Sequence, residues 1–485
     1  MQSNDSSLFQ YEIPSIRRLV LFFLLGLTAL IGVAVDLNSE LSWHDQQRME
    51  QIALLTIAML GSATIWRADL VGMLARLPTW VKWSWMCAFG IGLVSATRSD
   101  YPRFALVEWA SFLSLLWLAL LWAGQVSKAN DLDKWLQRLV IAVAVVIAVK
   151  VMASYLGSII PRVKLDSTIL FTEGFSNRRF FGQIATVLIP LLAYPLIRES
   201  LSRTKWLSVF LLLSTWWMLA IASGTRGTWL ALALSSGVLM AGAWRSSLPW
   251  LNVQAKAFVL GMGLFGLLFL WVPQLSQLDT SVENRFSDIT TLSGREILWD
   301  TAVDQVRAHP LLGIGPMHLA AIKNHIAAHP HNSALQLMAE WGIPASLALA
   351  MPLAIGLVSL LRMVRKPPDG EANLLVCLLA ALLAATTQSM VDGVIVMPYT
   401  QLWLVVIAGW ALGTYYKTVT RKFDLRPSPQ IVWVAPLVSI MGLALLLASI
   451  SPEVMNWQAS IQRYVDEGSF LPPRYWVRGW IPTGQ

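Results

Sequence analysis

The feature that most constrains this chain is a series of apolar runs, each close to 20 residues long, that recurs along its length. A run of that length crosses the hydrocarbon core of a bilayer as one α-helix. Only 13% of the residues are charged, about half the fraction usual in soluble domains. The sequence therefore predicts an all-α, polytopic membrane helical bundle of about 13 transmembrane helices. We place these spans at residues 19–35, 50–66, 81–97, 104–125, 139–156, 181–197, 206–222, 228–244, 257–274, 334–361, 373–391, 400–416 and 431–450.

The polar residues divide the chain into four parts. We expect an N-terminal transmembrane bundle of about nine spans over residues 1–274, a large loop over 275–333, further spans over 334–450, and a short tail over 451–485. Within the loop, apolar residues at 298, 299, 302, 303 and 306 form one stripe at helical spacing. That stripe predicts a helix over 294–307 that lies on the membrane surface or on the bundle. A second short helix is expected over 317–328.

The basic residues indicate how the chain is threaded through the membrane. If the N-terminus is cytoplasmic, more than half of the 36 Lys and Arg residues fall on cytoplasmic loops, as the positive-inside rule requires. The large loop, the 157–180 loop and the tail then face the other side. The first span follows Arg17 and Arg18 and has no usual cleavage site after it, so we expect it to be retained. The formal net charge of +8 is thus explained by topology and does not indicate a nucleic-acid partner.

A pair of histidines, His329 and His331, stands where the large loop returns to the membrane, and Glu340 follows within the apolar segment. Because an ionisable group is costly to bury there, such residues are candidates for function. The alternative is a pair of interfacial histidines with one core glutamate that has a local partner. Asn332 follows His331 directly, and the apolar segment begins at about Ala334.

Four arginines on the outer side also stand out. Arg178 and Arg179 lie at the mouth of the sixth span, Arg226 lies in a short turn between two apolar helices, and Arg295 begins the amphipathic segment. A guanidinium group binds a phosphate through two parallel hydrogen bonds and keeps its charge at any working pH. The alternative is that these arginines reach lipid phosphates or pair with acidic residues such as Glu173.

Other charged and metal-binding residue types give weaker signals. Exposed ion pairing is the simpler account of three further basic residues of the loop: Arg285, Arg307 and Lys323. Several histidines lie close together in sequence, but no HExxH spacing and no nearby acidic pair accompany them, so we expect no metal site. The two cysteines, Cys87 and Cys377, both lie in apolar segments, so no disulfide framework or cysteine metal site is implied.

An ordered set of motifs resembles the shared core of a superfamily of bacterial envelope proteins. The set covers roughly residues 175–345, and its members are Asn177-Arg178-Arg179-Phe180-Phe181-Gly182-Gln183, Thr225-Arg226-Gly227, Arg295, Trp299, His309-Pro310-Leu311-Leu312-Gly313-Ile314-Gly315, His331-Asn332-Ser333-Ala334-Leu335 and Glu340-Trp341-Gly342. The superfamily comprises O-antigen ligases, O-antigen polymerases and pilin O-oligosaccharyltransferases. This chain departs from it at Thr225, where serine is usual. The segments 392–398 and 472–476 look more like those of the pilin-modifying members.

The resemblance implies a metal-independent integral-membrane glycosyltransferase without a cofactor, in the bacterial inner (plasma) membrane with a periplasmic active site. Its partners would be a polyprenyl (undecaprenyl) diphosphate-linked glycan, an acceptor hydroxyl on lipid A-core or on a pilin Ser/Thr, and membrane lipids. His331 would be the catalytic residue, since the N-terminal end of a helix keeps its ring neutral. The arginines described above would bind the diphosphate: Arg178, Arg179, Arg226 and Arg295. His329, Asn332 and Glu340 would support the site, with Glu340 holding an arginine or a helix end.

Two other functions stay open at this point. An O-antigen polymerase would use the same residues with a growing glycan as acceptor. A lipid-linked glycan transporter or flippase would bind the same donor without cutting it. Many transporters carry internal repeats and broken helices at the middle of the membrane. No repeat is visible in this sequence, and its polar groups gather at one side.

Overall fold

A computed structural model describes residues 16–38, 40–129, 131–198, 201–280, 294–367, 372–419, 427–466 and 473–482. Over these ranges the chain is helical almost throughout and has no β-strand, only an isolated bridge between Leu165 and Thr280. The prediction of an all-α fold is confirmed. Arg285 lies outside the described residues.

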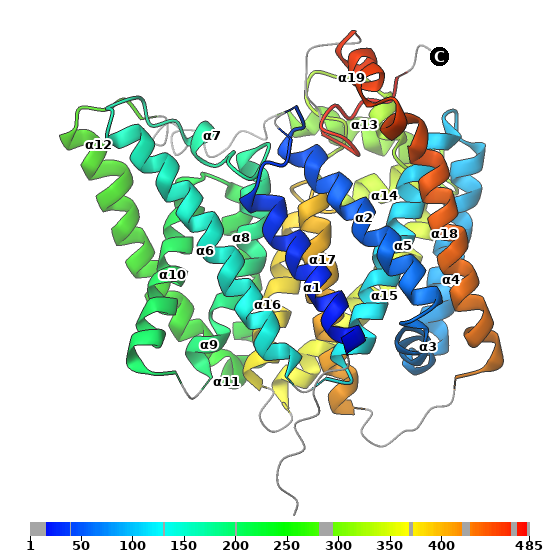
Figure 1. Ribbon diagram of the computed structural model, residues 1–485, viewed down its shortest axis with the longest axis horizontal. Helices are drawn as coiled ribbons and strands as arrows, with labels where there is room; N and C mark the ends of the chain where they lie inside the picture. The colour runs from blue at the N-terminus through cyan, green and yellow to red at the C-terminus, as the bar shows by residue number, and fades with distance from the viewer. Residues whose placement is uncertain are drawn as a thin grey trace, which may run out of the picture.

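The helices follow one another along the chain with short connections (Figure 1). They are α1 (Ile16–Ala34), α2 (Trp43–Ala63), α3 (Arg67–Arg76), α4 (Thr79–Arg98), α5 (Pro102–Val126), α6 (Leu132–Ile159), α7 (Ser167–Leu170), α8 (Arg178–Leu192), α9 (Tyr194–Ile197), α10 (Arg203–Ala222), α11 (Arg226–Phe265), the π-helix η1 (Gly266–Trp271), α12 (Val272–Leu275), α13 (Arg295–Ala308), the 3₁₀ helix η3 (His318–Ala321), α14 (Ser333–Trp341), α15 (Ile343–Arg365), α16 (Ala372–Ser389), α17 (Pro398–Val419), α18 (Pro429–Met455) and α19 (Trp457–Asp466).

The predicted number of spans is not confirmed. Among the described residues, nine helices are long and apolar enough to cross a membrane, or up to ten if α2 and α3, which meet at 81°, form one broken span. The apolar part of α1 is shorter than this, and α11, η1 and α12 form one stretch of 50 residues where we predicted two spans. A straight helix of that length would measure about 75 Å, more than twice the thickness of the hydrocarbon core. The stretch has a kink at Ala243, where the backbone leaves helical geometry.

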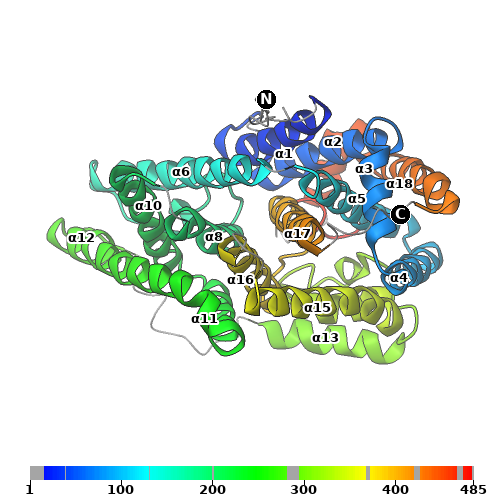
Figure 2. The same cartoon turned by 90° about the horizontal axis from the view of Figure 1, so that it is seen from below.

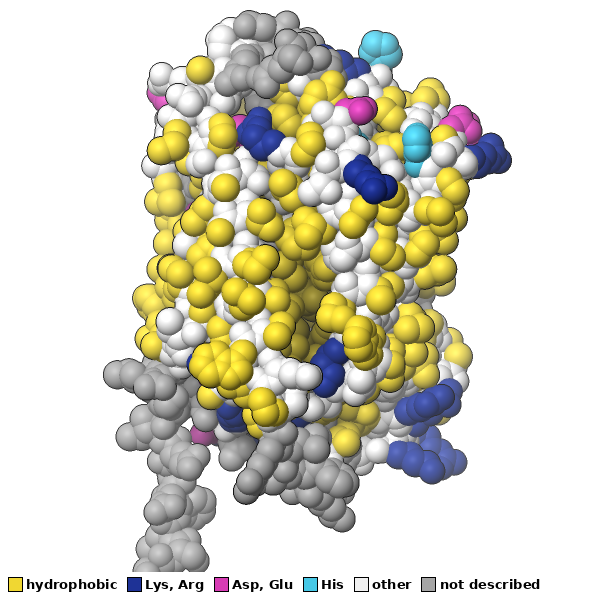
Figure 3. Space-filling view, turned by 90° about the vertical axis from the view of Figure 1, so that its right-hand side faces the viewer, with side chains coloured by type: hydrophobic (Ala, Val, Ile, Leu, Met, Phe, Trp, Pro, Cys, Tyr) yellow, Lys and Arg dark blue, Asp and Glu magenta, His cyan; other side chains and the backbone are white. Residues whose placement is uncertain are grey.

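The long helices pack into a bundle around α17. This helix contacts α5, α16, α2 and α8, and Figure 2 shows it in the middle of the larger group of helices. Helices α10, α11 and α12 lie together at the other side of the molecule. On the face seen in Figure 3, a broad band of apolar side chains separates the charged side chains at the two ends of the molecule. Such a band matches the hydrocarbon layer of a bilayer.

The large loop is only partly as predicted. Helix α13 confirms the expected amphipathic helix, but the helix expected over 317–328 is wrong, since only the short η3 forms there. Asn324 explains this, because its side chain accepts hydrogen bonds from the backbone N–H groups of Ile326 and Ala327 and closes a turn instead. The apolar helix expected over 334–361 is broken into α14 and α15. Gly342 has a φ of +81° at the break, a conformation open to glycine, and Pro344 follows it.

Candidate active site

The segment of His329 and His331 lies at the end of the bundle that carries α13 and α14. Trp299 of α13 donates a hydrogen bond from Nε1 to the carbonyl of Pro330 at 3.0 Å, which fixes the segment against α13. Asn332 then caps α14 by accepting a hydrogen bond from the backbone N–H of Leu335. His331 itself has a φ of +52°, a rare left-handed conformation for a residue with a side chain. Strained backbone of this kind is concentrated at functional sites in proteins.

The His331 ring lies between an arginine and a carboxylate that come from distant parts of the chain. Its Nε2 lies 3.4 Å from Nη1 of Arg179, at the first turn of α8. Its Nδ1 lies 3.6 Å from Oδ1 of Asp392, in the segment between α16 and α17. The imidazole is only 8% exposed. An imidazole with a carboxylate beside Nδ1 can accept a proton at Nε2.

The charges around His331 favour a neutral ring beside an ionised carboxylate. Burial lowers the pKa of His331, and Arg179 and Arg295 lower it further, while Asp392 opposes them. Burial by itself raises the pKa of Asp392, but its contacts with His331 and Arg179 outweigh burial, so the pKa lies below its ordinary value. The site thus holds an imidazole that is uncharged and able to take up a proton.

His329 supports the backbone of the same segment. Its ring lies 4.2 Å from the ring of His331, at 72° to it, and its Nδ1 accepts a hydrogen bond from the backbone N–H of His331 at 3.3 Å. Burial and the neighbouring His331 lower the pKa of His329 well below its ordinary value. His329 therefore acts as a neutral acceptor that holds the strained backbone of His331 in place.

Packing between helices brings Arg226 to the same end of the bundle as Arg179. Arg226 begins α11, and Thr228, two residues later, donates a hydrogen bond to the carbonyl of Gly182 on α8. Gly182 makes this approach possible, because a Cβ there would lie 2.6 Å from Oγ1 of Thr225. Arg178 and Arg179 begin α8, and Asn177 caps this helix by accepting a hydrogen bond from the N–H of Arg179.

Arg295 completes a cation-rich cluster with Arg179 and Arg226. Burial lowers the pKa of Arg295, and the positive charges of Arg179 and Arg226 lower it further, while the negative charge of Asp392 opposes them. Its Nε is buried and has no hydrogen-bond partner among the described residues. We call the groups of Arg179, Arg226, Arg295, His331 and Asp392 the arginine cluster. Like charges gathered in this way favour the binding of an anion.

Glu340 lies away from His331, in a second buried cluster. Its Oε2 lies 2.6 Å from Nη2 of Arg474, and its Oε1 accepts a hydrogen bond from the N–H of Leu319 at 3.0 Å. Arg474 also pairs with both oxygens of Glu108 on α5, and the Gln336 amide, with its oxygen turned toward the guanidinium, accepts from Nη1 at 2.8 Å. The arginine that Glu340 holds is thus Arg474. We call Arg474, Glu108, Glu340 and Gln336 the Arg474 cluster.

Three of these residues had no role in the sequence analysis. Glu108 lies within an apolar run, and an ionisable residue at membrane depth is itself a signal that could have marked it. Asp392 and Arg474 lie in the segments 392–398 and 472–476, which stood out only for their resemblance to pilin-modifying members, and nothing local pointed to their partners. Only the fold brings them together.

The large loop contains several histidines, which are common metal ligands. Over the described ranges, no three His, Cys, Asp or Glu side chains gather where they could hold a metal ion. His318 has another role, because its Nε2 accepts a hydrogen bond from the N–H of Tyr101 and its Nδ1 lies 2.9 Å from the carbonyl of Pro316.

Comparison with known families identifies the central part of the chain. Residues 207–350 match the family described as O-antigen ligase. The chain carries an O-antigen ligase domain. The matched segment runs from α10 into α15 and contains Arg226, Arg295 and His331, whereas Arg179 and Asp392 lie outside it. The resemblance described from the motifs is confirmed. No curated protein matches the chain.

The match over residues 207–350 and the apolar helices together support a multi-pass membrane protein that is similar to O-antigen ligase- or polymerase-like glycosyltransferases. In general, the partners of this family are a lipid-linked glycan and an acceptor.

Proposed function

We propose that this O-antigen ligase-like protein transfers a glycan from polyprenyl (undecaprenyl) diphosphate to an acceptor hydroxyl on lipid A-core or pilin, at the periplasmic face of the inner membrane. The observation that carries the proposal is the placement of a buried, neutral His331 within 3.4 Å of Arg179, inside the arginine cluster. The excess of basic residues on loops of the opposite end supports the orientation.

The reaction is a substitution at the anomeric carbon of the glycan. Nε2 of His331 takes the proton of the acceptor hydroxyl, whose oxygen forms the new glycosidic bond. The bond between the anomeric carbon and the diphosphate oxygen breaks, and its electron pair leaves with the diphosphate. Arg179, Arg226 and Arg295 stabilise the negative charge that gathers on the leaving group. Arg178, beside Arg179 on the first turn of α8, contributes to the same electrostatic field.

Asp392 has a positioning role in this scheme. Its carboxylate lies near Nδ1 of His331, so the ring is oriented with Nε2 toward the arginines and the reacting atoms. It also stabilises the imidazolium that forms when the acceptor proton arrives. Asn332 and His329 hold the backbone on either side of the base.

The decisive experiment follows the leaving group. The purified protein in nanodiscs is given lipid-linked glycan together with lipid A-core, pilin or a second lipid-linked glycan, and free polyprenyl diphosphate is measured with the product. We expect release that depends on one of the three acceptors. Release only with the second lipid-linked glycan would identify a polymerase, and absence of release with every acceptor would overturn the proposal.

A His331→Ala variant separates the enzyme from a flippase. The variant should lose transfer while it still binds the lipid-linked donor, because the arginines are intact. His325→Ala, at an exposed histidine of the same loop, is the matched control and should keep full activity. A variant that lacks His331 and still moves donor between leaflets at the wild-type rate would favour a flippase.

A further inference from the structure

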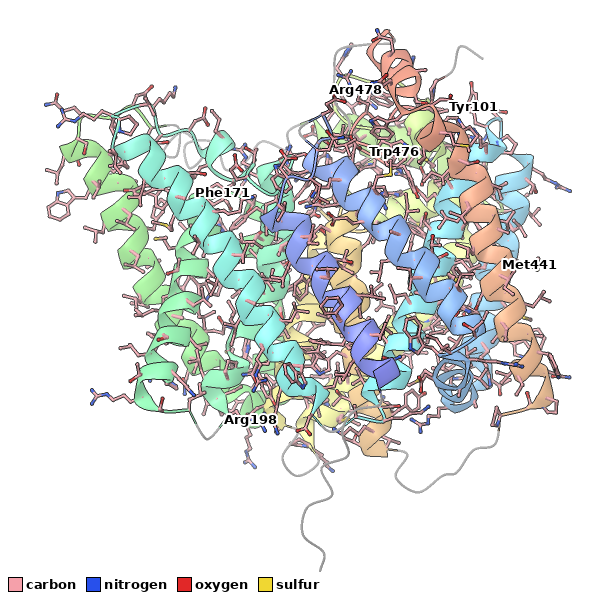
Figure 4. All side chains as sticks on the ribbon, viewed as in Figure 1. Tyr101, Phe171, Arg198, Met441, Trp476 and Arg478 are labelled. Atoms are coloured by element: carbon pink, nitrogen blue, oxygen red, sulfur yellow. The ribbon has the colours of Figure 1, made fainter. Side chains whose placement is uncertain are left out.

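A cavity of about 520 Å³ borders the first turn of α8, the turn that also carries Arg179. Its walls come from the start of α2, the segment before α8, the end of α18, α19 and the tail that carries Trp476 and Arg478. In Figure 4, Trp476 and Arg478 lie at the end of the molecule opposite to Arg198. The volume is within the range of small-ligand sites, about 300–1,000 Å³. Nothing in the proposed reaction uses this cavity.

Aromatic side chains form much of its wall. Trp43, Phe175, Phe180, Trp457 and Trp476 all line it. The rings of Trp457 and Trp476 lie 4.9 Å apart at 78°, and Trp476 donates a hydrogen bond from Nε1 to Glu453. Flat aromatic faces with fixed orientation suit the C–H face of a pyranose ring, which is apolar while its edge is polar.

The polar groups of the cavity suit hydroxyl groups. Ser460 is 5% exposed, and its Oγ is buried without a hydrogen-bond partner in the part of the chain that the structure describes. A buried hydroxyl without a partner is uncommon in proteins, and in the wall of a cavity it can bond to a ligand or to a water molecule. Asn177 also lines the cavity and offers an amide beside it.

The charge of the cavity is opposite to that of the arginine cluster. Four carboxylates line it, from Glu40, Asp45, Glu173 and Glu453, against the one guanidinium of Arg478. Behind this wall Glu453 pairs with Arg103 at 3.4 Å and Glu173 lies 3.9 Å from Lys150, so Glu40 and Asp45 give the wall most of its acidic character. An acidic wall disfavours a uronic acid or a phosphorylated sugar and favours a neutral or amino-bearing one.

The cavity and the arginine cluster share one structural element. Asn177 and Phe180 line the cavity, and Arg178 and Arg179 lie between them in the sequence. One turn of α8 therefore carries both a guanidinium of the arginine cluster and an aromatic ring of the cavity wall. A substrate with a diphosphate and a sugar chain has the same separation of charge.

We propose that this cavity is a sugar subsite, which takes a neutral or amino-bearing pyranose of the glycan and excludes acidic sugars. The role of the subsite in glycan transfer rests on the proposed function, because the sugar belongs either to the lipid-linked donor or to the glycan of the acceptor. The binding of a sugar in the cavity does not depend on the proposed function.

Direct binding is tested with the full chain in nanodiscs and three soluble probes. These are chitotriose, which is neutral, the chitosan trimer, which carries amines, and trigalacturonate, which carries carboxylates. Calorimetry should show binding of the first two and at least tenfold weaker binding of the third. Equal binding of trigalacturonate would overturn the charge preference, and absence of binding by all three probes would overturn the subsite.

Variants at Trp457 test whether the probe binds in the cavity. Trp457→Ala should weaken binding of chitotriose about tenfold, as is usual when an aromatic anchor is removed, and Trp457→Phe should restore most of it. Trp83→Ala, at a tryptophan that is 58% exposed on α4, is the matched control. Ser460→Val removes the unpartnered hydroxyl and should also weaken binding. Unchanged binding in Trp457→Ala and Ser460→Val would overturn the assignment.

The kinetic arm identifies the source of the sugar. In the transfer assay, Trp457→Ala should raise KM for one substrate and leave kcat close to wild type. A higher KM for the lipid-linked glycan assigns the cavity to the donor, and a higher KM for the acceptor assigns it to the acceptor. If neither KM changes, the subsite has no part in transfer. Calorimetry needs no turnover, so failure of the proposed function would leave the binding result intact.

Discussion

The two buried charge clusters of this protein are built in opposite ways. In the Arg474 cluster, one fully buried guanidinium is paired with two carboxylates, at 2.6 Å from Glu340 and 2.7 Å from Glu108. In the arginine cluster, three guanidinium groups surround one carboxylate, that of Asp392, which lies 3.6 Å from His331. The first cluster has short contacts between opposite charges, and the second has longer contacts and more cations than carboxylates.

This difference separates a structural role from a ligand-binding one. The partners of Arg474 come from α5, α14 and the tail, so the cluster joins three distant parts of the chain. Its guanidinium has no exposed surface and cannot meet a substrate. The arginine cluster holds three guanidinium groups and one carboxylate, and this excess of cations favours the approach of an anionic diphosphate.

The largest effect is expected from Arg474→Met. Removing one partner of a buried ion pair leaves uncompensated charge and typically costs about 3–5 kcal/mol of stability. Denaturation of the purified protein in detergent measures the loss. The triple variant Arg474→Met, Glu108→Gln, Glu340→Gln should recover much of it, because the two carboxylates that Arg474 pairs with are then neutral as well. Arg307→Met, at an exposed arginine on α13, should change nothing. Similar stability of the two single variants would show that the Arg474 cluster does not hold the fold.

In the arginine cluster, Arg179→Met and Arg295→Met should lower turnover and leave the stability of the fold intact, the reverse of what is expected from Arg474→Met. Each should lower turnover by about 10²–10³, the usual effect of removing one group that stabilises charge in a transition state. Stability should be kept or slightly raised, since each substitution relieves repulsion between like charges. Arg179→Lys should keep part of the activity, because it retains the charge but loses the planar fork. A loss of stability without a loss of turnover would make these arginines structural.

The pH dependence of transfer tests the neutral imidazole. Burial lowers the pKa of His331 below 6.5, so the base stays unprotonated as the pH falls through 6.5 and is lost only at lower pH. The profile of kcat/KM should therefore stay level between about pH 8 and pH 6.5 and fall below that. The folded protein should also lose stability as the pH falls below 6.5. The reason is that His331 has its ordinary pKa in the unfolded chain, which then binds more protons than the folded chain and is stabilised relative to it. A fall that begins above pH 6.5 would contradict this environment for His331.

The smallest effect is the change in that profile caused by Asp392→Asn. Asp392 raises the pKa of His331 against the larger effect of burial, so its neutralisation should move the acid limb to still lower pH. Turnover at neutral pH should also fall, by about tenfold, because the imidazolium loses its nearby anion. An acid limb that moves to higher pH would show that Asp392 does not act on His331.

The sequence predicted the parts of the fold and site that depend on local pattern. Apolar runs marked the helices, the stripe over 294–307 marked α13, and motif spacing marked His331 together with the outer arginines. The predictions were wrong where one side chain or one backbone angle decides the local structure. Asn324 closes a turn where a helix was predicted over 317–328, and Gly342 divides the helix predicted over 334–361 into α14 and α15. Local pattern also failed for Asp392 and Arg474, whose roles come from partners more than 60 residues away, such as Arg474 with Glu340, 134 residues apart.

The spacing within the Arg474 cluster has a consequence for how the protein is made. Arg474 follows Glu108 by 366 residues, which a ribosome adds in roughly 20–70 s at bacterial or eukaryotic speeds. Throughout that interval α5 must lie in the membrane, or beside the insertion machinery, while Glu108 lacks its ion-pair partner Arg474. A chain cut before residue 474 never acquires that cation, so cellular proteases should recognise it as unfinished even though all its long apolar helices are present.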